Sequence, residues 1–152
     1  MADLYEDDVL LWSELQSELL RRRAAGELVN EAELDWPNIA EEIESVGRSQ
    51  LSAVRSHIVH AFLHDLKAEA WPEARDAPHW RSEARRARID AAEAYVPSMR
   101  RRIDIADLYA KALRIMPEQN DGQPPLPVTQ VCPVTLDELL AAGTEVAANT
   151  RP

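Results

Sequence analysis

The chain has 152 residues, a net charge of −10 at pH 7, 45% hydrophobic residues and a single cysteine, Cys132. This length suits one domain that buries roughly two thirds of the surface of its unfolded chain, and one cysteine excludes an intramolecular disulfide and a cysteine-based zinc site. We expect a cytoplasmic protein without a signal peptide or a membrane span, because the N-terminus is acidic and no apolar run approaches about 20 residues.

The composition and the charge layout favour helices that pair with one another. Only four glycines and one phenylalanine occur beside abundant alanine, leucine, glutamate and arginine, which is typical of an all-α protein. Residues 1–47 carry a net charge of −10, residues 48–116 carry +4, and the last 36 residues carry −4. We therefore expect ion pairs between segments, and we expect no general affinity for nucleic acid or for an anionic membrane.

The first predicted helix runs from Leu4 to Ala25 and ends at Gly26. One face carries an apolar stripe at the helical period, made by Leu4, Leu11, Trp12, Leu15 and Leu19. Asp8 falls inside this stripe. A buried carboxylate needs a partner, so we expect Asp8 to lie at the wet end of the stripe or to meet a cation or backbone donors.

The second predicted helix is long and starts after a polar connector. Asp35 is a good N-terminal cap, and Pro37 fits the first turn because its missing N–H costs nothing there. Apolar residues then recur at steps of three and four, which predicts one helix from Trp36 to Glu69. Gly47 lies inside it, and we expect it to permit the close approach of a neighbouring helix; a bend is the alternative.

Two further helices and an extended segment follow. Asp76 can cap a third helix over Ala77–Tyr95, and Pro97 opens a fourth helix that continues to Leu113. Small residues line one face of the third helix, and this seam predicts close antiparallel packing against the fourth. Five prolines between residues 117 and 134 exclude a helix there and predict an extended strap across the bundle, anchored by Leu126, Val128 and Val131.

The end of the chain completes the predicted fold. Thr135 and Glu138 match a capping box, which starts a last short helix, and residues 148–152 are expected to fray. The prediction is a single all-α domain over residues 1–147, built as a bundle of four main helices with the strap and the C-terminal helix added.

Three histidines in the second helix are the first candidates for chemistry. His57, His60 and His64 line one strip, and His60 and His64 could chelate one zinc or iron ion as an i, i+4 pair. The alternative places one histidine at a helix interface and leaves two partly exposed. Asp65 lies beside them and is expected in a buried ion pair or a cap contact, with a general acid or base as the alternative.

Acidic and basic groups on the helices form the second set of candidates. Glu41, Glu42 and Glu44 cannot share one face, so one can approach the core while another faces water. A basic strip on the third helix could bind phosphate beside Trp80, which could stack on a base; it consists of Arg81, Arg85 and Arg88. Pairing of these arginines with acidic helices is the competing interpretation.

Several of these residues also carry a resemblance to a bacterial family catalogued as domain of unknown function twenty-nine. The likeness covers about residues 3–142. Its pattern is similar to Tyr5, Asp8 and Trp12, then Leu34-Asp35-Trp36, Glu41 to Glu44, Gly47-Arg48-Ser49, His64, Lys67, Trp80, Cys132-Pro133, Thr135 and Leu139. Ala68 and Val134 stand where the family would have aromatic residues. The resemblance implies an all-α fold and supplies no established activity, catalytic residue or cofactor.

The resemblance also singles out a candidate polar network around His64. Its members are Asp8, Glu41, Glu42, Glu44, Arg48, His64 and Lys67. The leading hypothesis is a non-enzymatic interaction or accessory protein that presents a helical surface to a protein partner or to another copy of itself. The alternatives are a small metal-binding protein or enzyme with a site around His64, and nucleic-acid binding through the arginine strip.

Overall fold

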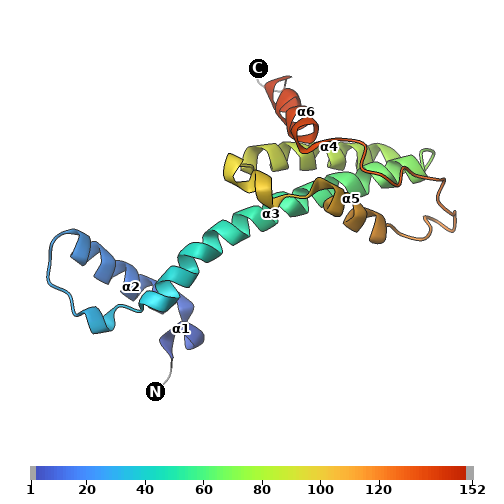
Figure 1. The fold of residues 1–152 in the computed structure, drawn as a ribbon. Helices are drawn as coiled ribbons and strands as arrows, with labels where there is room; N and C mark the ends of the chain where they lie inside the picture. The colour runs from blue at the N-terminus through green and yellow to red at the C-terminus, as the bar shows by residue number, and fades with distance from the viewer. Residues whose placement is uncertain (1–2, 150–152) are drawn as a thin grey trace. The chain divides into compact units, whose positions relative to one another are not determined.

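The computed structural model describes residues 3–149, and side chains as far as Glu145. Its regular elements are all helical, which confirms the predicted all-α fold (Figure 1). The α-helices are α1 (Leu4–Asp7), α2 (Val9–Ala24), α3 (Trp36–Ala70), α4 (Ala77–Ala94), α5 (Ile105–Arg114) and α6 (Leu136–Asn149). Two 3₁₀ helices, η1 (Glu31–Glu33) and η2 (Pro97–Arg102), lie in the connections. None of the described helices is long and apolar enough to cross a membrane.

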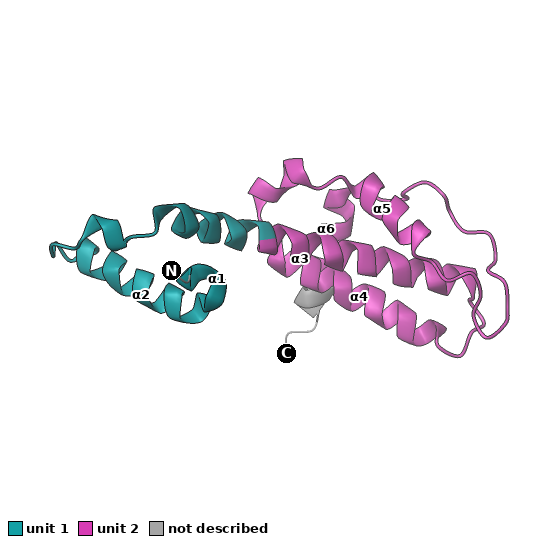
Figure 2. Cartoon of the chain, turned by 90° about the horizontal axis from the view of Figure 1, so that it is seen from below, with its two compact units in different colours: residues 1–48 teal, residues 49–152 magenta. Residues whose placement is uncertain are grey.

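The backbone contacts divide the chain into two compact units, residues 1–48 and residues 49–152, called unit 1 and unit 2 (Figure 2). The boundary falls inside α3, so this one helix supplies residues to both units. Each unit has its own hydrophobic core and is described by itself. The single domain expected over residues 1–147 stays a prediction.

Unit 1 is held together by a small core under α2. Trp12, Leu34 and Ile39 are buried, and Leu4, Tyr5, Leu19, Leu20 and Val29 pack around them. Two hydrogen bonds of the Gln16 side-chain amide fix the connector to α2. The amide donates to the Glu33 carbonyl (3.1 Å) and accepts from the Asp35 N–H (2.9 Å). This arrangement presents the start of α3 to the middle of α2.

The predicted continuous helix from Leu4 to Ala25 is wrong at one residue. Asp8 leaves the helical conformation, with φ −152° and ψ 80°, and its carboxylate accepts a hydrogen bond from the Leu11 N–H at 3.0 Å. A side chain that satisfies a free N–H in this way starts a new helix. Asp8 is therefore the N-cap of α2 and is exposed, at the wet end of the apolar stripe.

The long second helix is confirmed, since α3 runs from Trp36 to Ala70. The role predicted for Gly47 is wrong, because a Cβ built on it would meet nothing within 4 Å. Close approach occurs instead at Gly143 of α6, where a built Cβ would collide with the main-chain carbonyl of Arg88 and lie 3.0 Å from the Cβ of Ala92. Both of these neighbours belong to α4, which crosses α6 closely.

Unit 2 has the larger core, centred on the C-terminal part of α3. Its buried members on α3 are Leu51, Val54, Ile58, Val59, Phe62 and Leu66, and α5 adds Leu108, Tyr109 and Ala112. Met99 and Ile103 precede α5 and are buried in the same cluster, and Ala91 of α4 with Leu136 and Leu139 of α6 completes it. This cluster is a helical bundle of the predicted kind.

The predicted fourth helix is divided in two, so that prediction is wrong in its middle. Pro97 opens the 3₁₀ helix η2, Ile103 is extended, and Asp104 then caps α5 by accepting from the Asp107 N–H at 3.2 Å. The close helix partner of α4 is α6 rather than this segment. The physical cause is the same as at Asp8, a carboxylate that restarts the helix.

The strap over residues 117–134 is confirmed, but its anchors differ from the predicted ones. Leu126 and Val131 are 54% and 77% exposed, so of the three expected anchors only Val128 packs against the core. Hydrogen bonds fix the strap instead: Tyr109 donates to the Thr129 carbonyl (2.6 Å), and the Thr129 N–H donates to Glu69 (3.0 Å). An extended segment without its own ladder needs such partners for its backbone.

The last helix is longer than predicted. Thr135 accepts from the Glu138 N–H at 3.2 Å, which confirms the capping box. Helix α6 then continues to Asn149 and so includes the first two residues of the expected frayed tail. Residues 150–152 of that tail lie outside the described residues.

Candidate functional site

The seven residues of the predicted polar network divide between the two units. Unit 1 holds Asp8, Glu41, Glu42, Glu44 and Arg48, and unit 2 holds His64 and Lys67. Within each unit these residues make separate local contacts. Their joint role as one network stays a prediction.

The three glutamates at the start of α3 divide between a wet face and a core edge, as their spacing predicts. Arg48 pairs with Glu41 and, at 3.5 Å, with Glu44, and all three side chains are exposed. Glu42 is half-buried and accepts a 2.7 Å hydrogen bond from the Tyr5 hydroxyl. This hydrogen bond, burial and the charges of the nearby carboxylates raise the pKa of Tyr5 to about 12.

His64 is half-buried and makes a local contact in α3. Its Nδ1 lies 2.9 Å from the His60 carbonyl oxygen, and burial lowers its pKa. The His60 ring lies 4.1 Å from the His64 ring, and its Nε2 lies 3.6 Å from a carboxylate oxygen of Glu83 on α4. Within residues 3–149, no three histidine, cysteine, aspartate or glutamate side chains gather where one metal ion could sit. A metal role for His60 and His64 stays a prediction.

The remaining network residue, Lys67, lies against an aromatic ring. Its Nζ is 4.5 Å from the ring centroid of Trp80, which is a cation–π contact. Trp80 is only 5% exposed and packs with Trp71, so the suggestion that it could stack on a nucleic-acid base is wrong. Its large face is already used inside unit 2.

Asp65 forms the predicted ion pair, and its partner is Arg88 of α4. The pair is half-buried rather than fully buried, with side-chain exposures of 40% and 26%. Burial raises the pKa of Asp65, while the Arg88 charge opposes that rise. This pairing also engages one of the three arginines in the strip proposed for phosphate, leaving Arg81 and Arg85 exposed on α4.

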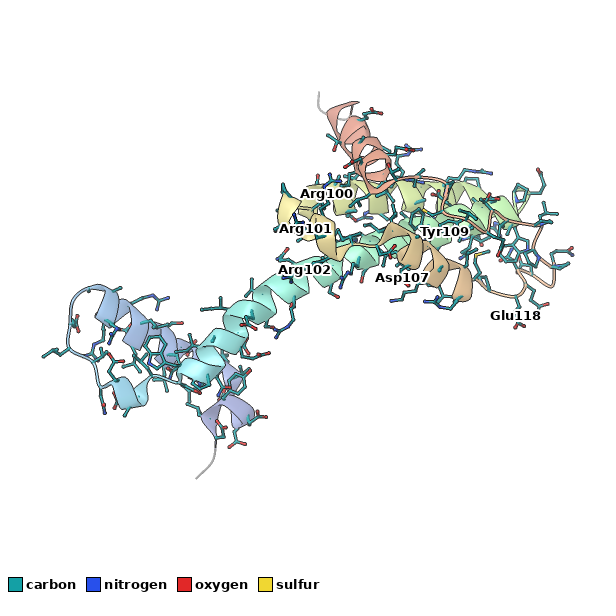
Figure 3. All side chains as sticks on the ribbon, in the orientation of Figure 1. Arg100, Arg101, Arg102, Asp107, Tyr109 and Glu118 are labelled. Atoms are coloured by element: carbon teal, nitrogen blue, oxygen red, sulfur yellow. The ribbon has the colours of Figure 1, made fainter. Side chains whose placement is uncertain are left out.

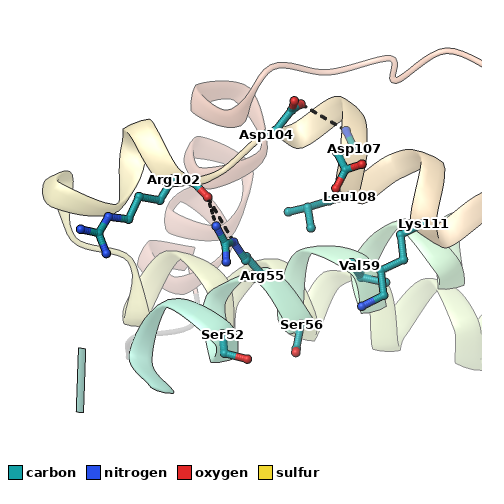
Figure 4. Close-up of a pocket in the computed structure, with 9 residues that line it drawn as sticks. All are labelled: Ser52, Arg55, Ser56, Val59, Arg102, Asp104, Asp107, Leu108 and Lys111. Carbon is teal, nitrogen blue, oxygen red and sulfur yellow. Dashed lines mark hydrogen bonds between the residues drawn. The ribbon is translucent and has the colours of Figure 1, made fainter. Parts of the chain in front are cut away.

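Unit 2 also contains a polar hollow that sequence reasoning missed. Arg100, Arg101 and Arg102 end η2 (Figure 3), and Arg102 lies at the rim of a hollow of about 460 Å³ beside α3 and α5 (Figure 4). Arg55 crosses the hollow and donates from Nε to the Arg102 carbonyl at 3.1 Å. Its guanidinium thereby engages the backbone, and Asp104 and Asp107 place two carboxylates beside the cationic side chains of Arg55, Arg102 and Lys111. The hollow is therefore lined by groups of both charges.

Another hollow is an apolar groove in unit 1. It has a volume of about 470 Å³ and lies between α2 and the first turns of α3, with Trp12 among its lining residues. Helix α2 contributes Val9, Leu10, Ser13 and Leu20, and α3 contributes Ile39, Glu42 and Ile43. Leu10 and Ile43 are 67% and 69% exposed. Contiguous exposed apolar surface of this kind marks sites of interaction.

Sequence reasoning missed this groove because it assigned one buried stripe to α2. Leu11 and Leu15 belong to that stripe but are exposed, and Leu10 points into the groove. The available signal was the leucine content of residues 9–20, which surrounds the helix instead of keeping to one face. A helix that is apolar on several faces needs more than one partner surface.

A comparison with protein families finds a match over most of the chain. The profile of one family matches residues 4–143. The chain belongs to the family described as Domain of unknown function DUF29. The family expected from the residue pattern is thus confirmed.

A solved crystal structure has a similar helical fold. A chain described as an alpha-helical protein of unknown function from Rhodospirillum rubrum is 26% identical in sequence, with a TM-score of 0.60, and the similarity covers 100% of both chains. No curated protein matches the sequence. These similarities establish the family and the helical fold of the DUF29 chain.

Proposed function

We propose that this DUF29 chain is a protein-interaction module whose unit 1 groove receives the apolar face of a helix from a partner protein. The single observation that carries the proposal is the exposure of large apolar side chains along one groove, above all Leu10 and Ile43. An amphipathic helix laid in an apolar groove is a recurring mode of protein recognition. No chemical step is needed for this role.

The physical driving force is the removal of these side chains from water. Fully burying one leucine or isoleucine side chain contributes about 1.5–3 kcal/mol, and a few such anchors dominate the affinity of most interfaces. Leu10 and Ile43 come from different helices and line the same groove, so a helix lying in the groove can contact both walls. Ser13, Gln16 and Ser17 supply polar groups beside the apolar walls.

Two other functions have less specific support. Nucleic-acid binding through the arginine strip is disfavoured by the Asp65–Arg88 pair and by the burial of Trp80. An enzyme or metal site around His64 draws its support from sequence spacing and from the proximity of His60. The apolar groove favours protein interaction more directly than either alternative.

The test uses a synthetic helical peptide with a leucine stripe and equal numbers of lysine and glutamate, so that its net charge is zero. We expect saturable binding of the labelled peptide to the full chain by fluorescence anisotropy. Replacing both anchors, Leu10→Ser with Ile43→Ser, should weaken binding by at least about tenfold, which is 1.4 kcal/mol. Leu28→Ser is the matched control because Leu28 is 98% exposed and lies outside the groove.

Three results would contradict the proposal. The peptide could fail to bind the unsubstituted chain, or it could bind the double variant equally well. The third result would come from sedimentation equilibrium, if the unsubstituted chain were a dimer and the Leu10→Ser, Ile43→Ser variant a monomer. The groove would then hold a second copy of the chain instead of a partner helix. Circular dichroism of each variant shows whether its helices are retained.

A further inference from the structure

Unit 1, which holds the groove, carries a large surplus of negative charge. Residues 1–48 contain thirteen acidic side chains and four arginines, a net charge of −9 at pH 7. Three of those arginines already pair with acids of the same unit: Arg22 with Glu27 at 2.9 Å, Arg23 with Glu31, and Arg48 with Glu41. Residues 49–152 are nearly neutral, with fourteen acids and thirteen bases. The surplus of the whole chain is therefore concentrated in the unit that holds the groove.

The local contacts place part of this charge at one end of the groove. Glu42 lines the groove and also accepts the hydrogen bond from Tyr5. The charges of Glu6, Glu41 and Glu42 all disfavour ionisation of Tyr5. On α2, Glu14 is exposed and follows Leu10 by four residues, so the two lie on neighbouring positions of the helix surface.

We infer that the helix bound in this groove is basic: lysine or arginine side chains flank its apolar stripe and are concentrated over the Tyr5–Glu42 end. This inference rests on the proposed function and names the chemistry of the partner. A basic edge neutralises the carboxylates that an acidic or neutral helix would leave unpaired, and opposite charges accelerate the encounter. A second copy of unit 1 would bring a charge of −9 against −9, so it is a poor occupant.

Three synthetic helical peptides with the same leucine stripe test the charge preference on the full chain. Their remaining positions carry lysine only, glutamate only, or equal numbers of both. In about 0.1 M salt, where charges act over about 10 Å, we expect the lysine peptide to bind about tenfold more tightly than the balanced one, and the glutamate peptide to bind most weakly. In about 1 M salt, where charges act over about 3 Å, the three affinities should converge.

Substitutions on the protein locate the charge that matters. Glu6→Gln with Glu14→Gln removes two charges near the groove and should reduce the preference for the lysine peptide about threefold while leaving the balanced peptide unaffected. Glu73→Gln with Glu118→Gln removes two charges from unit 2 and serves as the control of equal net charge. That control should keep the full preference.

The outcomes separate this inference from the proposed function. If the balanced peptide binds through Leu10 and Ile43 but all three peptides bind equally, the partner is not basic and the proposed function stands. If no peptide binds, the proposed function fails and the inference falls with it. If the lysine peptide binds the Leu10→Ser, Ile43→Ser variant as well as the unsubstituted chain, its binding is a general ionic attraction and the inference is wrong, while the balanced peptide still decides the proposed function. Equal losses from the two glutamate pairs would also overturn the inference.

Discussion

The Asp35 carboxylate joins α2 to the start of α3 through two hydrogen bonds. One oxygen accepts from the Trp12 indole at 2.9 Å and from the Asn38 amide at 2.8 Å. Asp35→Ala leaves the buried indole N–H without its partner, so we expect unit 1 to lose about 1–2 kcal/mol of stability. Amide exchange of α2 in increasing urea measures the loss. Asp35→Asn retains an acceptor oxygen and should cost less, and equal losses in the two variants would contradict the hydrogen-bond explanation.

The same carboxylate makes the stability of unit 1 depend on pH. Its hydrogen bonds, first the one from Asn38, lower the pKa of Asp35 below the ordinary value of 3.8. A lowered pKa contributes stability that is fully present above pH 3.8 and is lost as the pH falls through the folded-state value. We expect the stability difference between the unsubstituted chain and Asp35→Asn to shrink as the pH is lowered from 6 to about 3. A constant difference over that range in urea titrations would contradict this assignment.

At the residue scale, sequence reasoning succeeds where the contact is local. The capping box of Thr135 and Glu138 and the helix start at Asp35 depend on residues within a few positions, so the pattern predicts them. The Tyr5–Glu42 hydrogen bond joins residues 37 positions apart, and its partners follow from tertiary packing. Asp65 shows the intermediate case, because its need for a cation was predictable and the identity of Arg88 was not.

At the scale of elements, the crossing of α4 and α6 depends on Gly143. A Cβ at this position would collide with the Arg88 main chain, which cannot move aside as a flexible side chain can. We expect Gly143→Ala to destabilise unit 2 by about 1–3 kcal/mol, the usual cost of overpacking. Urea unfolding followed by circular dichroism measures this loss. An unchanged unfolding midpoint would mean that α6 does not pack as closely as the structure has it.

Gly47→Ala is the counterpart of that substitution within α3. The added methyl group would meet nothing within 4 Å, and alanine is the better helix former. We expect a gain in stability of up to about 1 kcal/mol, measured by the same urea unfolding. A loss would instead indicate that Gly47 serves the close approach that its position in the sequence suggested.

The elements themselves were largely predictable from apolar periodicity, and the errors share one cause. The apolar residues keep almost the same spacing across Asp8 and Asp104. The pattern therefore predicted one continuous helix where the structure has a helix break at each aspartate. Each aspartate accepts from the N–H three residues later, a local contact that competes with helix continuation. The groove was missed for a different reason, since the exposed faces of Leu10 and Ile43 depend on which neighbours the fold supplies.

At the scale of the whole molecule, the boundary between the units could not be predicted from the sequence. It falls between Arg48 and Ser49, inside a continuous helix, with no loop to mark it. Only the change of net charge near residue 48 coincides with it. The uneven charge was visible at once, but it was interpreted as a source of ion pairs between segments. Unit 1 keeps a surplus of negative charge after its arginines are paired. This charge could be related to a binding partner only once the groove was known from the structure.

The two units are expected to open at different urea concentrations. The buried cluster of unit 1 described here has three members, Trp12, Leu34 and Ile39, whereas that of unit 2 extends over α3, α5 and α6. Fewer buried apolar contacts give a lower free energy of local opening. Amide exchange followed by mass spectrometry should therefore show α2 and residues 36–48 of α3 losing protection together. Residues 54–66 of the same helix should lose protection later. Asp35→Ala should shift the first loss alone, and simultaneous loss along all of α3 would mean that the chain opens as one cooperative unit.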